Sequence, residues 1–276
     1  MSFVVTAEMI ERYVNDGVVC LRGVLEPKWI DVIERGLRDV EQAPGPMSYS
    51  ERDSANRMHY LSDMFSAVSN PWLRQFIFDG PIAATVGALL RATRINFFYD
   101  HSFLRRAGSS HVTEWHNDKA YWPVSGEQLC TVWVPVQAVT LRNGPLEYVI
   151  GSHKWERAFK DSFYPMYRQL DFRGLDPENA IVDEPPDVNA YRHAFNIATF
   201  ELDPGDCLVH HPLTLHASPK IDHDARRWAY ATRWAGDDVR FAPRVDTQRL
   251  VYDPGLNAGD PLDSELFPRV WPAPSH

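Results

Sequence analysis

Two histidines and one aspartate, His116, Asp118 and His216, are the residues of this chain whose types and spacing point most directly to chemistry. Two imidazoles and one carboxylate form a ligand set that holds Fe(II) on one side and leaves the other coordination positions open. In extended backbone, side chains two apart point the same way, so a strand at 115–118 would aim His116 and Asp118 at one ion. His216 follows Asp118 by 98 positions (216 − 118) and must arrive from a distant strand. The pattern predicts a metal site built from two separate segments.

The elements that would position these residues change in type along the chain. Thr6 can cap a helix that runs to about Asn15, and a second helix fits Pro27 to about Glu41. The polar stretch Met47–Asp63 is predicted to be a loop or lid. The other predicted elements are a strand at Val18–Leu21, short helices around Asn70–Phe78 and Pro81–Leu90, and strands at Ile95–Leu104, Gln128–Val139, Leu146–Ile150, Phe195–Leu202, Cys207–His210 and Trp228–Trp234.

Helices followed by many short strands indicate an α+β chain whose centre is a barrel or sandwich of mainly β structure. We expect a single domain over residues 1–276, with N-terminal helices over about 1–92 and a β core over about 93–240. Within the core, residues 154–196 are predicted to form an insertion over one mouth. Residues 241–276 are expected to form a C-terminal tail.

Composition excludes several classes of partner. A formal charge of −9 and a pI near 5.6 argue against nucleic acid or an anionic membrane, since both require concentrated positive charge. A small-molecule substrate is expected instead. Cys20, Cys130 and Cys207 lack any CxxC spacing and are expected to be reduced thiols. The N-terminus has no signal-peptide pattern, so the expected location is the cytoplasm, and the sequence favours neither a monomer nor an oligomer.

Four motifs between Ile95 and Arg240 are similar to those of a known family. They are, in chain order, Trp115-His116-Asn117-Asp118 followed by Tyr121-Trp122-Pro123; Asn143-Gly144-Pro145-Leu146 leading to Gly151-Ser152-His153; Pro204-Gly205-Asp206; and His216-Ala217-Ser218 followed by Arg227. With these motifs the chain resembles the phytanoyl-CoA dioxygenase family of Fe(II)/2-oxoglutarate-dependent oxygenases. The resemblance implies a double-stranded β-helix, a cupin-like jelly-roll barrel flanked by the N-terminal helices. The family more often has Gln at the position of Asn117, a side chain expected to point away from the metal.

The resemblance also implies that His116, Asp118 and His216 bind Fe(II). His210 and His211 are rival candidates for the third ligand, but His216 stands in the His-x-Ser context of the family. His210 or His211 would then be a partner that fixes the tautomer of His216.

For the cosubstrate 2-oxoglutarate, the resemblance implies that Arg227 binds the C5 carboxylate with help from Ser218. A guanidinium matches a carboxylate through two parallel hydrogen bonds. Strand alternation independently favours Arg227 over Arg226. Arg227 shares its face with two alanines, which leave room inside a barrel, whereas Arg226 shares its face with bulky aromatic residues.

Four further residues are assigned through the same resemblance. Arg105 stands where the family often has a lysine near the cosubstrate, and Trp133 matches a tryptophan that lines the cofactor pocket. Tyr121 and Trp122 follow the first metal ligands and are expected to form a wall of the substrate pocket.

The activity that the resemblance implies uses Fe(II), 2-oxoglutarate and O2 to hydroxylate, or otherwise oxidise, an unactivated C–H bond of a small organic metabolite or natural-product intermediate. Succinate and CO2 are released. Related halogenating enzymes have Gly or Ala at the position of Asp118, so a carboxylate favours oxidation without halogen transfer. Two alternatives stay open. One is a cupin-like metal-dependent dioxygenase or isomerase that does not use 2-oxoglutarate and would have no use for Arg227 and Ser218. The other is a catalytically silent jelly-roll binding protein.

Overall fold

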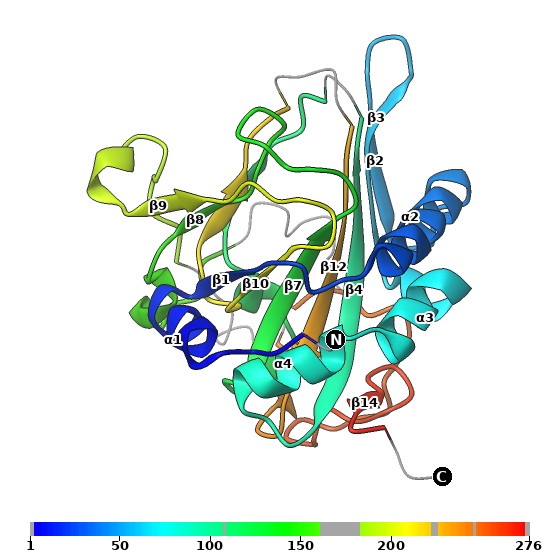
Figure 1. Ribbon diagram of the computed structural model, residues 1–276, viewed down its shortest axis with the longest axis vertical. Helices are drawn as coiled ribbons and strands as arrows, with labels where there is room; N and C mark the ends of the chain where they lie inside the picture. Colours follow the sequence, from blue (N-terminus) through cyan, green and yellow to red (C-terminus); the bar gives the residue numbers. More distant parts are fainter. Residues whose placement is uncertain (1–2, 107–108, 161–182, 222–225, 245–246, 274–276) are drawn as a thin grey trace.

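The large sheet of this protein is antiparallel and forms one wall of a barrel (Figure 1). The computed structural model describes residues 3–106, 109–160, 183–221, 226–244 and 247–273. Within these residues the large sheet has the strand order β1-β10-β7-β12-β4-β3-β2, and β14 pairs with β4. In that order the strands are β1 (Val18–Leu21), β10 (Cys207–His210), β7 (Leu129–Pro135), β12 (Arg227–Ala235), β4 (Ile95–Arg105), β3 (Met58–Met64), β2 (Ser48–Arg52) and β14 (Arg269–Trp271).

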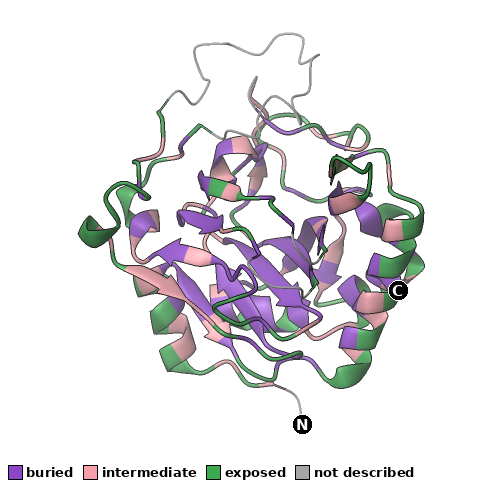
Figure 2. Cartoon of the chain, turned by 90° about the horizontal axis from the view of Figure 1, so that it is seen from above, coloured by how far each residue is buried: buried purple, intermediate pink, exposed green. Residues whose placement is uncertain are grey.

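A smaller sheet forms the second wall. Its order is β5-β11-β8-β9, and the strands are β5 (Thr113–His116), β11 (His216–Ser218), β8 (Glu147–Val149) and β9 (Ile197–Thr199). A separate pair joins β6 (Val124–Ser125) to β13 (Arg240–Phe241). The two walls confirm the predicted double-stranded β-helix with a mainly β core. Figure 2 shows its buried strands inside and the exposed helix faces outside.

In the part of the chain that the structure describes, four α-helices cover the outer face of the large sheet. They are α1 (Ala7–Asp16), α2 (Pro27–Gln42), α3 (Pro71–Asp79) and α4 (Ile82–Leu90). The predicted cap of α1 is confirmed, because the side chain of Thr6 accepts a hydrogen bond from the backbone N–H of Met9. Buried residues of the helices pack against Trp228 and Tyr230 of β12 in the largest hydrophobic cluster. None of the helices in the described residues is long and apolar enough to cross a membrane.

Strand β12 has two different faces, and this difference positions the functional site. Trp228 and Tyr230 point toward the helices, whereas Ala229 and Ala231 pack on the inner side with Trp133 and residues of β8. Alternation along an extended strand separates the two sets. The inner face therefore carries small side chains next to arginines, and it leaves space between the walls.

The prediction of a loop or lid at Met47–Asp63 was wrong. These residues form the β2–β3 hairpin, in which Ser48 pairs with Asp63, and β3 continues the large sheet by pairing Tyr60 with Arg105. Strand β2 lies at the sheet edge, where its side chains alternate between exposed and half-buried. An edge strand needs few apolar residues, so the polar sequence hid its extended conformation.

Within the described ranges, four short 3₁₀ helices join the strands: η1 (Ser66–Val68), η2 (Asp118–Tyr121), η3 (Ser152–Trp155) and η5 (Arg192–Ala194). The predicted strand at Phe195–Leu202 is shorter than expected, since only Ile197–Thr199 forms β9. Residues 161–182 of the predicted insertion lie outside the described residues.

Candidate active site

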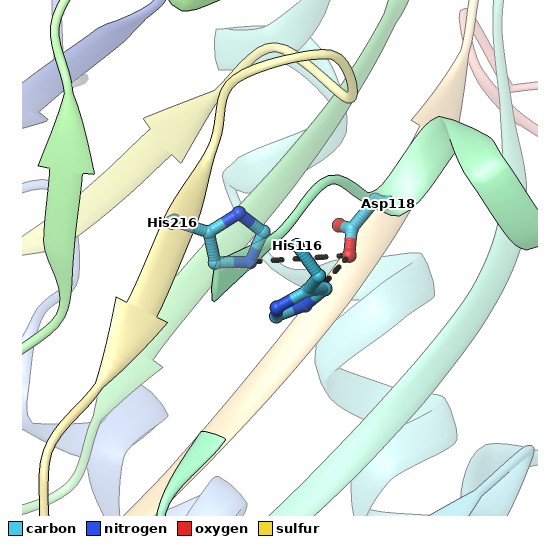
Figure 3. A group of neighbouring side chains, drawn as sticks. All are labelled: His116, Asp118 and His216. Atoms are coloured by element: carbon cyan, nitrogen blue, oxygen red, sulfur yellow. Dashed lines mark ion pairs between the residues drawn. The ribbon is translucent and has the colours of Figure 1, made fainter. Parts of the chain in front are cut away.

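His116, Asp118 and His216 lie together between the two walls (Figure 3). Strands β5 and β11 pair His116 directly with His216, and the two ring centroids are 4.2 Å apart. The Oδ1 atom of Asp118 lies 3.8 Å from His116 Nε2 and 3.9 Å from His216 Nε2. One ligand atom from each residue lies within 4.8 Å of the other two. The structure thus brings the predicted triad to one place, close enough to share a single ion.

The backbone fixes the tautomer of each histidine. His116 Nδ1 lies 2.8 Å from the carbonyl oxygen of Glu114, and His216 Nδ1 lies 3.0 Å from that of Thr214. A carbonyl only accepts, so each Nδ1 carries the proton and each Nε2 keeps a lone pair. Two such nitrogens facing a carboxylate oxygen fit a divalent transition metal.

The sequence predicted that Asp118 lies in the same strand as His116. In the structure β5 ends at His116, and Asp118 is the first residue of η2. Asn117 between them keeps extended backbone (φ −126°, ψ 144°), so His116 and Asp118 still point to one side. The side chain of Asn117 points elsewhere, as expected: its Nδ2 donates to the carbonyl of Arg157 at 2.9 Å, and its Oδ1 accepts from the backbone of Phe159.

Both oxygens of Asp118 are held by neighbouring residues. Thr131 Oγ1 donates to Asp118 Oδ2 at 2.6 Å, and Tyr121 donates its hydroxyl to Asp118 Oδ1. His210 Nε2 lies 3.5 Å from Asp118 Oδ2, and its Nδ1 lies 3.2 Å from the Tyr148 hydroxyl. His210 therefore contacts the carboxylate and does not fix the tautomer of His216, contrary to expectation.

Electrostatics keep Asp118 and His216 in the protonation state that a metal requires. Burial would raise the pKa of Asp118, but the neighbouring His210 and the charge of Arg233 outweigh burial and hold that pKa well below its usual value. Burial, together with His116 and His210, lowers the pKa of His216 well below its usual value. The site therefore presents an ionised carboxylate and a neutral imidazole at neutral pH.

Arg227 lies at the opposite end of the same cavity. It is 3 % exposed, and its Nη1 donates to Ser218 Oγ at 3.0 Å and to the carbonyl of Gly144. Its Cζ lies 5.4 Å from the ring centroid of Trp133, and its buried Nε has no partner in the described residues. Burial and the charge of Arg105 lower its pKa well below the usual value. An incoming carboxylate would relieve this unbalanced charge.

Arg105 stands beside Arg227 rather than inside the cavity. The two residues are paired in register across β4 and β12. Arg105 Nη1 donates to the carbonyl of Pro219 at 2.6 Å and its Nη2 to Thr113 Oγ1 at 3.2 Å. Burial lowers the pKa of Arg105 to about 10, and the nearby Tyr60 and Glu51 act in the opposite direction by raising it. Arg226, by contrast, is exposed and pairs with Glu34 at 2.7 Å.

Trp122 and His211 are placed differently from expectation. Trp122 is fully buried in a hydrophobic cluster, donates its indole N–H to Tyr99 at 2.8 Å, and does not line the cavity. Tyr121 and Trp122 were both expected to form a wall of the substrate pocket, but only Tyr121, at the end of η2, lines the cavity. His211 stacks near Tyr13 and His153, away from the triad.

The cavity has an empty volume of about 920 Å³, measured out to its open mouth. It is walled by the triad, the residues around Arg227 and three polar groups that the sequence analysis did not single out, His101, Arg233 and Gln248. Arg233 could have been found by alternation, because it shares the inner face of β12 with Arg227. His101 and Gln248 give no local signal of this kind.

Comparison with known proteins agrees with this geometry. Residues 13–229 match the phytanoyl-CoA dioxygenase (PhyH) family. A comparison with curated proteins gives no match. Among solved structures, the fold is similar to the non-heme α-ketoglutarate-dependent carbocyclase SnoK from nogalamycin biosynthesis, with a TM-score of 0.72, 19% identity, and coverage of 96% of this chain and 96% of that one.

Two other solved structures have the same fold. The epimerase SnoN in complex with Fe3+, α-ketoglutarate and nogalamycin RO gives a TM-score of 0.72 and 20% identity, covering 95% of this chain and 97% of that one. EctD from S. alaskensis with 2-oxoglutarate and 5-hydroxyectoine gives a TM-score of 0.69 and 14% identity, covering 93% of this chain and 85% of that one.

A double-stranded β-helix with a buried His-Asp-His group between its walls defines an enzyme of the Fe(II)/2-oxoglutarate-dependent oxygenase class, with iron and 2-oxoglutarate as its cofactors. The family match covers most of the chain, and the protein belongs to the phytanoyl-CoA dioxygenase family.

Proposed function

We propose that this enzyme oxidises an unactivated C–H bond of a small organic metabolite or natural-product intermediate, with release of succinate and CO2. The observation that carries the proposal is the arrangement of one cavity, which has a His-Asp-His group that could hold a metal ion and, beside it, a buried arginine for which the described residues provide no anionic partner. Both halves of the cofactor requirement are met by neighbouring side chains.

Strand β11 links the two halves. It carries His216 at one end and Ser218 at the other, and Ser218 accepts the hydrogen bond from Arg227. Two residues of extended strand span roughly 7 Å. A five-carbon dicarboxylate is of comparable length, so 2-oxoglutarate fits with its C5 carboxylate on Arg227 and Ser218 and its 2-oxo acid end toward the triad.

The roles of the side chains follow from this arrangement. His116, Asp118 and His216 hold Fe(II), which when bound supplies the activation of O2 that the oxidation needs. Thr131 and Tyr121 hold the carboxylate of Asp118 in one orientation. Such outer partners fix ligand geometry and strengthen metal binding.

The walls near Arg227 orient the cosubstrate and exclude water. Trp133 packs over the guanidinium of Arg227, and Arg105 lies in register with Arg227 on the neighbouring strand, where its positive charge adds to the attraction for a carboxylate. A dry site strengthens the ion pair between arginine and carboxylate. Tyr121 lines the cavity beside Asp118 and is the aromatic residue we assign to the substrate side.

The test is anaerobic addition of Fe(II) and 2-oxoglutarate, followed by air and measurement of succinate. We expect a visible metal-to-ligand charge-transfer band and substrate-stimulated succinate release in the wild type. Asp118→Ala removes the carboxylate ligand and should lose both signals. Arg226→Ala, which removes an exposed arginine outside the cavity, is the matched control and should keep both.

Two outcomes would contradict the proposal. Metal binding without a charge-transfer band would favour a cupin-like dioxygenase or isomerase that does not use 2-oxoglutarate. Succinate release that persists at the wild-type rate in Asp118→Ala would mean that the triad does not hold the catalytic iron.

A further inference from the structure

Arg233 is a second buried guanidinium in the cavity, and the proposed function gives it no task. It is 3 % exposed and lies on the inner face of β12, six residues after Arg227, which corresponds to roughly 20 Å of extended strand. Arg233 pairs in register with Thr131, whose hydroxyl holds Asp118. Asp118 therefore lies near the Arg233 end of the strand, and 2-oxoglutarate on Arg227 would occupy the other end.

Three polar side chains toward the Arg233 end have buried atoms for which the described residues provide no hydrogen-bond partner. In the described part of the chain, the guanidinium of Arg233 makes one hydrogen bond, from Nη1 to the carbonyl of Ala231 at 3.2 Å, and its buried Nε makes none. The side-chain amide of Gln248 is 2 % exposed and lies near the Tyr99 hydroxyl, but neither its Nε2 nor its Oε1 reaches hydrogen-bond geometry. The buried Nε2 of His101 also lacks a hydrogen bond.

Three side chains with unsatisfied buried atoms at one end of a cavity are unusual. A buried polar atom left without a partner destabilises the folded state, and native proteins keep few such atoms. All three residues line the cavity that contains the triad. Their unsatisfied atoms indicate a ligand that is polar where it meets them.

Arg233 also stays charged in this place. Burial would lower its pKa, but Tyr99 and Asp118 outweigh burial, so that the pKa is raised. The Arg233 Cζ lies 4.6 Å from the Tyr99 ring centroid, a cation–π contact that stabilises the cation without neutralising it.

The charge balance of the cavity identifies the sign of the ligand. Asp118 is the one carboxylate among the described residues that line it, against the guanidiniums of Arg227 and Arg233. A ferrous ion, Asp118 and dianionic 2-oxoglutarate together carry one negative charge, which Arg227 balances. Glu51 balances Arg105 behind the cavity wall. Among the groups that line the cavity, Arg233 is then a positive charge in excess, since the nearby Asp100, whose pKa is raised to about 7, is only partly ionised at neutral pH. Buried charges require a partner.

We propose that the end of the cavity around Arg233 and Gln248 binds a carboxylate of the substrate, so that the substrate is a small organic acid. This inference rests on the proposed function, because it assumes that 2-oxoglutarate occupies Arg227. A carboxylate fits the planar fork of Arg233 through two hydrogen bonds and accepts a further one from the Gln248 amide. Met64, in register with His101, supplies an apolar wall for the rest of the molecule.

The test uses protein loaded anaerobically with Fe(II) and saturated with 2-oxoglutarate, so that Arg227 is already occupied. Calorimetric titrations with formate, acetate, benzoate and 3-phenylpropanoate are compared with titrations of the four corresponding primary amides. We expect at least one acid to bind at least about tenfold more tightly than its amide, as for one charge-assisted contact.

Variants separate this site from the cosubstrate site. Arg233→Met should weaken binding of that acid at least about tenfold, while the charge-transfer titration of 2-oxoglutarate stays within about twofold. Arg233→Lys keeps the positive charge but lacks the planar fork, so its affinity for the acid should be intermediate. This variant also tests the inference if Arg233→Met does not fold. Arg226→Met, at an exposed position, should change neither affinity.

Each contrary result has a distinct meaning. If the charge-transfer band forms but no acid binds, or acid and amide bind equally, or Arg233→Met leaves acid binding unchanged, the inference is overturned and the proposed function stands. If the wild type gives no band before any acid is added, the proposed function fails and the inference fails with it.

Discussion

At the scale of single residues, the site depends on which atom of each side chain faces the cavity. Both ligand histidines give Nδ1 to a backbone carbonyl, and both present Nε2 to Asp118. The backbone therefore decides the tautomer before any ion arrives, which reduces the reorganisation needed for binding. The same principle applies to Arg227, whose Nη1 is anchored by Ser218 and Gly144 while Nε stays without a partner.

Removing the Arg227 guanidinium should weaken 2-oxoglutarate binding without removing the metal. A hydrogen bond to a charged group contributes about 1.5–3 kcal/mol, so Arg227→Ala should raise the 2-oxoglutarate concentration needed for half-maximal succinate release roughly 10- to 100-fold. Arg226→Ala removes only an exposed ion pair with Glu34. It should change the 2-oxoglutarate concentration needed for half-maximal succinate release less than about twofold. A larger effect of Arg226→Ala would show that the assignment of the two strand faces is wrong.

At the scale of elements, β12 combines two functions because its faces differ. Its outer residues Trp228 and Tyr230 join the core under the helices, and its inner residues Arg227, Ala231 and Arg233 line the cavity. The small inner side chains matter as much as the arginines, since they leave the volume into which both carboxylates would extend.

Filling the inner face of β12 should close the cavity in steps. Ala231 pairs in register with Trp133 on one side and with His101 on the other. Ala231→Val and Ala231→Leu add bulk between the two arginines, so we expect 2-oxoglutarate affinity to fall progressively, by at least about tenfold for leucine. Circular dichroism should show a folded protein in both cases. Equal affinity in the leucine variant would mean that this face does not border the cosubstrate.

The junction of β4 with η1 predicts a pH dependence of stability. Asp100 is fully buried and accepts the backbone N–H of Ala67, and burial raises its pKa to about 7. Its unfolded-state pKa is about 3.9, so between about pH 4 and 7 the unfolded state loses the proton first, and stability falls as pH rises. The contribution of protonated Asp100 to the free energy of unfolding is complete at low pH and is lost by about pH 7.

Asp100→Asn should remove this dependence. Relative to the wild type, the variant should gain about 1–3 kcal/mol more free energy of unfolding at pH 7.5 than at pH 5, measured by urea denaturation at both pH values. A difference that does not change with pH would contradict the raised pKa of Asp100.

At the scale of the whole molecule, the cavity exists only where the two walls face each other. The large sheet contributes Arg227, Arg233 and Thr131, and the small sheet contributes His116 and His216. Ligands that bind between the walls therefore bind only the folded state. Binding free energy must appear as added stability.

Fe(II) with 2-oxoglutarate should raise the melting temperature. At a free ligand concentration about 100 times the Kd, the gain is about 2.7 kcal/mol, which corresponds to roughly 5–10 °C for a protein of this size. The measurement is anaerobic differential scanning fluorimetry, with Asp118→Ala as the comparison. An equal shift in that variant would place the metal somewhere other than the triad.

The sequence alone determined the features that depend on local periodicity and on residue type. The ligand types of the triad, the helices α1 and α2, the inner face of β12 and the choice of Arg227 over Arg226 all follow from neighbours within a few positions. Alternation in a strand decides which way a side chain points, and it needs no knowledge of the rest of the chain.

Only the tertiary structure decided which distant residues meet. His101, Arg233 and Gln248 come from three separated segments, His210 contacts Asp118 rather than His216, and Trp122 packs into the core beside Tyr99. Likewise, only the tertiary structure shows that the polar segment forms the β2–β3 hairpin and that β3 pairs with β4. Register between strands far apart in the chain is set by packing of the whole barrel, so no local pattern encodes these contacts.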